Sequence, residues 1–342
     1  MTSFTVPKKL SMAATGAVFA ALTTVCQAQA ATLKPSLASS FSNFYSVTEL
    51  GSVPQLPPTY AGMTFKPGDP NTLLIGGLSN TFDAGIYAVN VMRGTDNRIT
   101  GFGSASLFAN APGIKTPEID EAGVDAGLAY SPQNDVLFYT SYPDNSIGQI
   151  KLGSSGPDKQ INLGTLGIPV STGALNFVPK GFAGAGRLKI TSYTENIFYD
   201  TTIIPDGSGT YDIAAPSKSI KLSGGLDSFN YIKAGNPRFS TDSLLLLEYD
   251  DGKIAAYAID DNGDPIKDTR QDFVTGITLP IGSTIDPLTN DLLFSIQTDD
   301  AKVFLVSGFT KSASVPEPSI TVASLGILGL SLLLKKKVNQ AR

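Results

Sequence analysis

A short strand motif recurs along the central part of this chain, and it constrains the fold more than any other feature. Each copy has a run of small and apolar residues, a turn that contains proline, and a second, more strongly apolar run. The clearest copies begin at Ala61, Ala126, Thr172 and Gly282, and a weaker copy begins at Phe229. Repeats of roughly 50 residues indicate one supersecondary unit that is used several times. We therefore expect the units to pack side by side in one continuous fold.

Each copy predicts β-structure, because short apolar runs alternate with Gly, Pro, Asn and Asp and no helical period is sustained. A third strand follows the two strands of the motif, as at residues 85–89 and 302–306. A more polar fourth strand follows in the first four copies, as at residues 160–163 and 271–274. Repeated four-stranded units indicate an all-β chain folded as a β-propeller. The pattern is similar to that of the NHL and quinoprotein-like propeller families.

The predicted propeller spans residues 41–309 and has five four-stranded blades. A sixth blade would fit if one of the longer copies contained an extra unit, and a β-sandwich or a solenoid would show a similar strand pattern. The last copy has no fourth strand, whereas residues 45–50 alternate between apolar and polar side chains ahead of the first copy. We expect this segment to pair with the last blade and to close the ring, which removes two exposed edges. Residues 309–314 would then form a free linker.

The C-terminal tail has three parts in a fixed order. Residues 310–319 form a linker that ends in Val315, Pro316, Glu317, Pro318 and Ser319. Residues 320–334 are apolar, and the basic segment 335–342 begins with Lys335, Lys336 and Lys337. The tail resembles the PEP-CTERM sorting signal of Gram-negative bacteria. That resemblance implies export, exosortase as the processing partner, and a final location at the cell surface or outside the cell.

The apolar part of the tail predicts a C-terminal transmembrane helix. Fifteen residues in a helix would span about 22 Å, which is short for a hydrocarbon core of about 30 Å. The lysines that follow would stay on the cytoplasmic side, because basic residues are retained there. The protein would therefore be held in the membrane until its tail is processed. The alternative is a plain membrane anchor that is never cut.

The N-terminus reads as a signal peptide over residues 1–30. Lys8 and Lys9 precede an apolar segment, and Ala28 and Ala30 form a small-x-small cleavage pattern. Cys26, the only cysteine, would be removed with this segment unless it carried a lipid. The residue before it is Val25, which does not suit a lipidation motif. The exported chain is then expected to have no disulfide bond.

Charge and composition exclude several functional classes. Six of the 25 basic and one of the 30 acidic side chains lie in the two terminal segments, so residues 31–315 carry a net charge of −10. This balance argues against a nucleic-acid partner and against electrostatic binding to anionic lipid, but it is compatible with cation binding. The chain has no histidine, which excludes Ser-His-Asp triads and histidine-ligated metals. It also has no tryptophan, which weakens carbohydrate recognition by ring stacking.

Asp260, Asn262 and Asp264 resemble the start of a calcium-binding loop, with oxygen ligands at alternate positions. Pro265 replaces the glycine that such loops need, and Gln271 replaces the bidentate glutamate. The alternative is a hairpin turn between the third and fourth strands of a blade. Calcium is the cofactor that the first interpretation implies, and otherwise the cofactor is unknown.

A second acidic group precedes the first strand of the second copy, on the face where propellers usually bind ligands. Its members are Glu118, Asp120, Glu121 and Asp125. They could bind calcium or supply the acid and base of a glycosidase if further carboxylates converged from other blades. Asp227 is a candidate for this, whereas Asp286 should lie at the far end of its strand. The alternative is a set of solvated loop acids, and Arg187 and Lys189 are likewise expected to face solvent.

The first interpretation of function is a non-enzymatic, exported propeller that acts in binding, adhesion or structure at the cell surface or in the extracellular matrix. Families with such a tail occur mostly in bacteria that produce exopolysaccharide, and this resemblance suggests exopolysaccharide as a partner. The alternative is a secreted, metal-dependent propeller hydrolase of the lactonase or glycosidase type. The fold by itself does not choose between them, since propellers have many functions.

Overall fold

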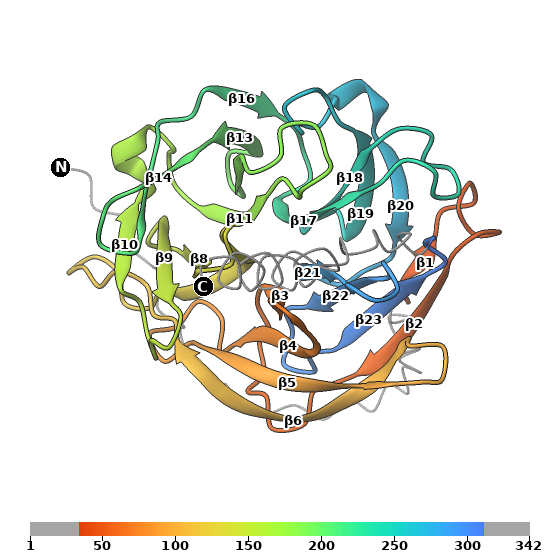
Figure 1. Ribbon diagram of the computed structural model, residues 1–342, viewed down its shortest axis with the longest axis horizontal. Coiled ribbons are helices and arrows are strands. Elements are labelled where there is room, and N and C mark those ends of the chain that lie inside the picture. The colour runs from red at the N-terminus through yellow and green to blue at the C-terminus, as the bar shows by residue number, and fades with distance from the viewer. Residues whose placement is uncertain (1–33, 311–342) are drawn as a thin grey trace, which may run out of the picture. The chain divides into compact units, whose positions relative to one another are not determined.

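The computed structural model describes residues 34–310, which form a five-bladed β-propeller (Figure 1). The strands of each blade are antiparallel and run outward in order from the central axis. The predicted signal peptide, sorting motif, apolar tail segment and basic cluster all lie outside the described residues. Within residues 34–310, no helix is long and apolar enough to cross a membrane.

Five sheets of similar architecture make up the ring, and their strand bounds are as follows. Blade 1 contains β3 (Met63–Lys66), β4 (Asp69–Gly77), β5 (Gly85–Arg93) and β6 (Ile99–Asn110). Blade 2 contains β7 (Gly123–Tyr130), β8 (Val136–Tyr142), β9 (Ser146–Lys151) and β10 (Lys159–Asn162). Blade 3 contains β11 (Thr172–Phe177), β12 (Leu188–Ser192), β13 (Ile197–Thr201) and β16 (Lys218–Lys221). Blade 4 contains β17 (Leu226–Ile232), β18 (Ser243–Glu248), β19 (Lys253–Ala258) and β20 (Gln271–Thr275).

Blade 5 contains β21 (Pro280–Ile285), β22 (Leu292–Ile296) and β23 (Val303–Ser307), and it takes its outer strand from the other end of the propeller. That strand is β2 (Ser46–Gly51), in which Val47 lies opposite Val306 of β23. The predicted ring closure is therefore confirmed. A further short strand, β1 (Ser36–Leu37), adds to the outer edge of blade 4 and was not predicted.

An aromatic cluster holds residues 38–45, which connect β1 at the edge of blade 4 to β2 at the edge of blade 5. Tyr45 packs against Phe309 with ring centroids 4.8 Å apart, and Phe41 meets Phe273 at 5.0 Å. The backbone N–H of Thr310 donates to the side chain of Asn236 at 2.7 Å. The expectation that the linker begins at residue 309 is wrong, because Phe309 and Thr310 are held in the fold by these contacts.

The hydrophobic core lies between the blades rather than in one central mass. The four consecutive leucines of β18 show this arrangement. Leu244 and Leu246 belong to the apolar cluster on one side of blade 4, and Leu245 and Leu247 belong to the cluster on the other. A strand buried on both faces needs a continuous apolar run, which is why the second strand of each copy is the most apolar.

The centre of the propeller is crowded, and small residues relieve the crowding. A Cβ atom on Gly282 of blade 5 would lie 2.1 Å from the carbonyl oxygen of Ala61 in blade 1, and one on Gly173 would lie 2.0 Å from that of Leu226. The first strands of blades 2 to 5 also have a register shift at this level. Such bulges bend a strand and turn its side chains in new directions. Here they occur where the strands meet the axis.

Blade 3 is lengthened by an extra hairpin, β14 (Ile203–Pro205) and β15 (Tyr211–Ile213), and not by another blade. Two short 3-10 helices, η1 (Leu163–Leu166) and η2 (Lys267–Thr269), complete the elements of the described residues. The expectation that Lys189 of β12 faces solvent is wrong. This side chain is fully buried, and its ammonium group binds the carboxylates of Asp200 and Asp264. Asp264 comes from blade 4, so the local sequence pattern does not reveal it.

Candidate functional site

A small cavity lies at one end of the propeller axis, beside the beginnings of the first strands. Its volume is about 150 Å³. Blades 1 to 5 all contribute to its wall. The lining residues are Asn80, Asp125, Tyr142, Tyr193, Asp227, Tyr249 and Gln297. We call this cavity the axial mouth.

Two aspartates at the axial mouth come from the bulges of the first strands. Asp125 lies in the irregular part of β7, between Val124 and Leu128. Asp227 lies in the corresponding part of β17, between Leu226 and Phe229. Both side chains are buried, with 6% and 4% of their surface exposed. The bulges thus turn two carboxylates from different blades into one cavity.

The rim of the axial mouth comes from an equivalent position in four blades. Tyr142 ends β8, and Tyr193, Tyr249 and Gln297 each follow directly after the second strand of their blade. Asn80 follows the second strand of blade 1 after two further residues. Blades 2 to 4 therefore provide aromatic rings, and blades 5 and 1 provide amides. Repetition of the blade converts one sequence position into a ring of side chains.

Hydrogen bonds hold the rim residues in place. The Tyr193 hydroxyl donates to Asp250 at 2.8 Å, and the Tyr249 hydroxyl donates to the amide oxygen of Gln297 at 2.9 Å. Gln297 in turn donates to Ser79 of blade 1 at 2.8 Å. The rings of Tyr193 and Tyr249 are 5.7 Å apart and nearly perpendicular, at 86°. The rim is therefore cross-linked through blades 4, 5 and 1.

The electrostatics of the axial mouth disfavour negative charge. Burial raises the pKa of Asp125 to about 7, and the neighbouring Asp144 adds to the shift. Burial also raises the pKa of Asp227 well above its usual value, with Asp125 and Asp250 adding repulsion. The pKa of Tyr249 rises to about 12, first because of burial and then because of Asp227 and Asp125. A cation in this cavity would oppose the electrostatic part of all three shifts.

The pairing of buried carboxylates separates this site from the rest of the propeller. Residues 34–310 contain eight buried carboxylates. Five of them form ion pairs with lysine or arginine, namely Asp200, Glu248, Asp264, Asp286 and Asp291. The other three, Asp125, Asp144 and Asp227, have no basic partner among the described residues. Charges are rarely buried without a partner, so the exception points to a ligand or to bound protons.

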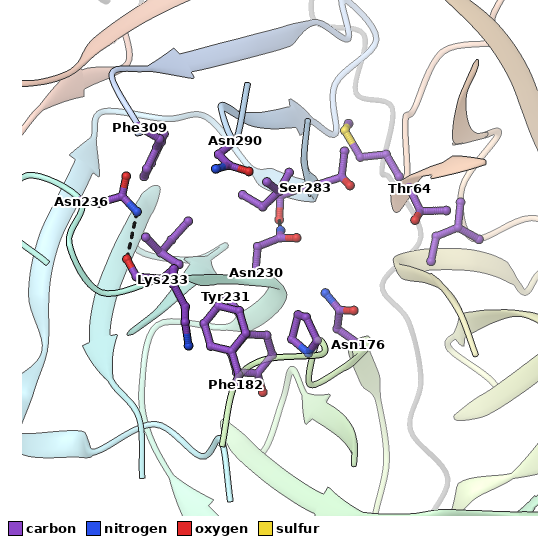
Figure 2. Close-up of a pocket in the computed structure, with 16 residues that line it drawn as sticks. Thr64, Asn176, Phe182, Asn230, Tyr231, Lys233, Asn236, Ser283, Asn290 and Phe309 are labelled. Atoms are coloured by element: carbon purple, nitrogen blue, oxygen red, sulfur yellow. Dashed lines mark hydrogen bonds between the residues drawn. The ribbon is translucent and has the colours of Figure 1, made fainter. Parts of the chain in front are cut away.

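The opposite end of the axis has a different character. A pocket of about 300 Å³ lies there, next to a wider groove of about 900 Å³. Figure 2 shows Phe182, Tyr231 and Lys233 on one side of the pocket and Asn230 beside Ser283 on another. Lys233 lies over the Phe182 ring, 4.5 Å from its centroid, and also binds Asp242 at 2.7 Å. The charges that line this pocket are thus matched within the protein.

The structure separates the acids that the sequence grouped together. Glu118, Asp120 and Glu121 are exposed on the loop before β7, and Glu121 accepts a hydrogen bond from the backbone of Phe82. Only Asp125 reaches the axial mouth. Asp286 lies beyond the end of β21, at the other end of the axis, as expected from its place in the repeat.

The sequence pattern predicts neither the rim tyrosines nor the role of Gln297. These residues have no charge and do not form a motif in sequence. The signal that could have revealed them is their shared position after the second strand of each copy. An alignment of the copies by that strand places Tyr193, Tyr249 and Gln297 in one column.

The segment proposed as a calcium loop forms the turn between β19 and β20. Asp260 accepts hydrogen bonds from the backbone N–H groups of Asn262 and Asp264, and Ile259 pairs with Pro265. Lys218 binds the Asp260 carboxylate at 2.6 Å. The pKa of Asp260 is lowered although burial alone would raise it, because Lys218 and the turn stabilise the anion. Within residues 34–310, no group of three or more Cys, Asp or Glu side chains is placed to hold a metal; calcium binding here stays a prediction.

Comparisons with known proteins assign no family to this chain. No protein-family model matches the chain, and no curated protein matches it. An auxiliary nutrient binding protein from Bacteroides ovatus is 12% identical over 77% of this chain and 76% of its own, with a TM-score of 0.45. The soluble aldose sugar dehydrogenase of Escherichia coli is 10% identical over 76% and 86%, with a TM-score of 0.42. The periplasmic gluconolactonase of Pseudomonas aeruginosa is 13% identical over 76% and 74%, also with a TM-score of 0.42. At such values the similarity says nothing about activity or ligand.

Proposed function

We propose that this protein is an exported, non-enzymatic binding propeller whose axial mouth takes a positively charged ligand. The observation that carries the proposal is the distribution of buried charge. Within residues 34–310, Asp125 and Asp227 of the axial mouth lack a basic partner, as does Asp144 outside its lining, whereas the five other buried carboxylates have one. A bound cation would supply the missing counter-charge.

The arrangement around Asp227 supports this proposal. Its carboxylate lines the cavity, and within residues 34–310 no hydrogen bond holds it. The charged groups that raise its pKa, Asp125 and Asp250, are both acids. An uncompensated buried carboxylate destabilises a fold. Such a group suits a binding site, because a bound cation would offset the unfavourable free energy of the buried charge.

A thermal-unfolding experiment tests the proposal. The purified full-length chain is heated at pH 8 with calcium, magnesium or methylammonium chloride, each against sodium chloride at equal ionic strength. A ligand present at 100 times its Kd stabilises the fold by about 2.7 kcal/mol. We expect at least one cation to raise the Tm by several degrees, and the increase to be lost in Asp227→Asn. If no cation shifts the Tm, the axial mouth is not a cation site.

A hydrolase is the second candidate, because one observation favours it. The pKa of Asp125 is raised to about 7, which is the range of a general acid at neutral pH. Asp227 from another blade would be the second carboxylate of a glycosidase pair. Turnover of aryl glycosides or lactones that is lost in Asp125→Asn would support this function. Absence of turnover in assays with and without calcium would remove it.

The export route and the place of action rest on the two terminal segments, which lie outside the described residues. The resemblance to a PEP-CTERM tail supports processing by exosortase and display at the cell surface or in the matrix, with exopolysaccharide as a partner. The intact mass of the secreted protein tests this route. A chain that begins near Ala31 and ends near Glu317 is expected, and a secreted chain with an intact C-terminus would contradict tail processing.

A further inference from the structure

We infer that the cation taken by the axial mouth is an organic ammonium group rather than a divalent metal ion. This inference rests on the cation-binding function proposed above and specifies its ligand. It is carried by the aromatic wall of the cavity and by the small number of oxygen atoms that are available to a metal.

Three consecutive blades place a tyrosine ring at the axial mouth, namely Tyr142, Tyr193 and Tyr249. The planes of the last two are nearly perpendicular, as are adjacent walls of a box. Aromatic rings attract ammonium groups within about 6 Å of the ring centre, and several rings together form the cages that bind methylated amines. With Asp125 and Asp227 in the same cavity, the site combines aromatic walls with negative charge.

The axial mouth offers few oxygen atoms that could serve as ligands for calcium or magnesium. Calcium takes six to eight oxygen ligands, and magnesium requires near-ideal octahedral geometry. The axial mouth has two carboxylates in its lining, and one amide oxygen of the rim, that of Gln297, already accepts the Tyr249 hydroxyl. The Tyr193 hydroxyl is likewise bound to Asp250. The hydrogen bonds thus leave ring surfaces, two carboxylates and the amide oxygen of Asn80, which has no partner among the described residues, for the ligand. The rings and carboxylates attract the charge of an ammonium group, and the amide oxygen can accept one of its N–H groups.

The size of the cavity agrees with this assignment. A volume of about 150 Å³ is several times the roughly 30 Å³ that one water molecule occupies in the liquid. A bare metal ion would leave much of this space unfilled, whereas an ammonium group with its attached carbons would occupy it. Because the residues of its rim are partly exposed to solvent, the rest of a larger amine can extend outward. Two sources of the ammonium group therefore fit: a small alkylamine, or an amino sugar with a free amine.

Calorimetric titration of the full-length chain at pH 7, where the glucosamine amine is mostly protonated, distinguishes these ligands. The probes are tetramethylammonium, methylammonium, glucosamine and calcium chloride, with N-acetylglucosamine as the uncharged partner of glucosamine. We expect the amines to bind and N-acetylglucosamine not to bind. A preference for glucosamine over methylammonium would identify an amino sugar as the source, and the reverse order would identify an alkylamine.

Paired variants test the role of the rings. Tyr249→Phe keeps the ring and removes the hydrogen bond to Gln297, whereas Tyr249→Leu removes the ring. We expect an affinity within about threefold of the original for the first variant and a loss of tenfold or more for the second, at equal Tm. Asp227→Asn should also weaken binding at least tenfold. Leu288→Ala, an exposed position on the opposite face, is the control and should bind normally.

The outcomes distinguish a failure of the ammonium assignment from a failure of the cation-binding function. Calcium binding that depends on Asp227, without amine binding, would overturn the ammonium assignment and leave the cation site standing. Equal loss in Tyr249→Phe and Tyr249→Leu would also overturn it, because the ring would then not contribute. If neither amines nor metal ions bind, the cation-binding function itself fails.

Discussion

Arg93 of blade 1 donates two hydrogen bonds to Asp286 of blade 5, at 2.7 and 3.0 Å, and this ion pair joins the first and last blades. The Asp286 side chain is fully buried. Asp227 is buried to a similar degree at the opposite end of the axis, yet it has no basic partner among the described residues. The two aspartates are therefore matched in burial and opposite in electrostatic environment.

The same substitution should change stability in opposite directions at these two positions. Asp286→Asn leaves the Arg93 charge without its partner and should lower the free energy of unfolding by about 3–5 kcal/mol. Asp227→Asn removes an unpaired buried charge and should raise it at pH 8 by about 1–3 kcal/mol, the usual cost of a buried polar group without a partner. Urea unfolding measures both values.

The pH dependence provides the control for the Asp227 variant. The folded-state pKa of Asp227 is raised, so between the unfolded value of about 3.9 and the folded value the native protein holds the extra proton. The original protein must then lose stability as pH rises through this window, relative to Asp227→Asn. The gain from the substitution should be small at pH 4 and largest at pH 8. A gain that does not change with pH would contradict an unpaired carboxylate.

Ligand affinity should rise with pH for the same reason. A cation prefers the ionised form of Asp125, whose pKa is about 7, with Asp144 and Asp227 as its acidic neighbours. Tetramethylammonium does not titrate, so its affinity should increase about tenfold between pH 6 and pH 8 as one proton is released. Titration in buffers with different ionisation enthalpies measures that proton. An affinity that is constant over this range would mean that Asp125 is already ionised at pH 6.

The crowded axis should not tolerate an added methyl group. Gly282→Ala would place a Cβ 2.1 Å from the backbone oxygen of Ala61, which has little freedom to move. We expect a loss of about 1–3 kcal/mol or more, as for other overpacked sites. Gly156→Ala is the matched control, because the nearest atom would be 4.0 Å away. Equal unfolding midpoints for the two variants would show that the central strands can move apart.

The C-terminal boundary of the propeller should lie after Thr310. A chain that ends at Thr310 keeps the contact of Phe309 with Tyr45 and the hydrogen bond to Asn236, so it should unfold at the same urea concentration as the full chain. A chain that ends at Gly308 loses both and should be less stable by about 3–5 kcal/mol, which is typical for removal of a buried phenylalanine. Phe309→Ala in the full chain is the control and should show most of that loss. Equal stability of the two truncated chains would mean that Phe309 adds nothing.

Much of the fold could be predicted from the order of apolar runs. The strands of blades 1 to 5 occur where the copies of the motif place them, and β2 closes the ring as expected. These features depend on local patterning and on the need to pair an edge strand, and both can be recognised in one sequence. The short strand β1 could not be predicted in the same way, because two residues carry no usable period.

The candidate site was predictable only in part. The sequence indicates Asp125 and Asp227 as acids near first strands, but it carries no motif for the tyrosines of the rim. Lys189 looked solvent-facing because its partner Asp264 lies 75 residues away in another blade. Where the role of a side chain depends on contacts with residues of other blades, the sequence around it does not predict that role.

The sequence by itself determined the all-β class, the repeated strand order and the closing strand, because hydrophobic burial imposes a strand period that can be counted along the chain. The choice between five blades and six was left to the tertiary structure, which assigns the extra length of blade 3 to a hairpin. Tertiary structure alone decided which acids are buried without a partner and which rings surround them. Bulges in β7 and β17 turn Asp125 and Asp227 into one cavity, and the circular packing of blades brings Tyr142, Tyr193 and Tyr249 to its rim. The physical reason is that local patterning sets which face of a strand is buried, whereas the charge balance of a site depends on groups that only the closed ring brings together.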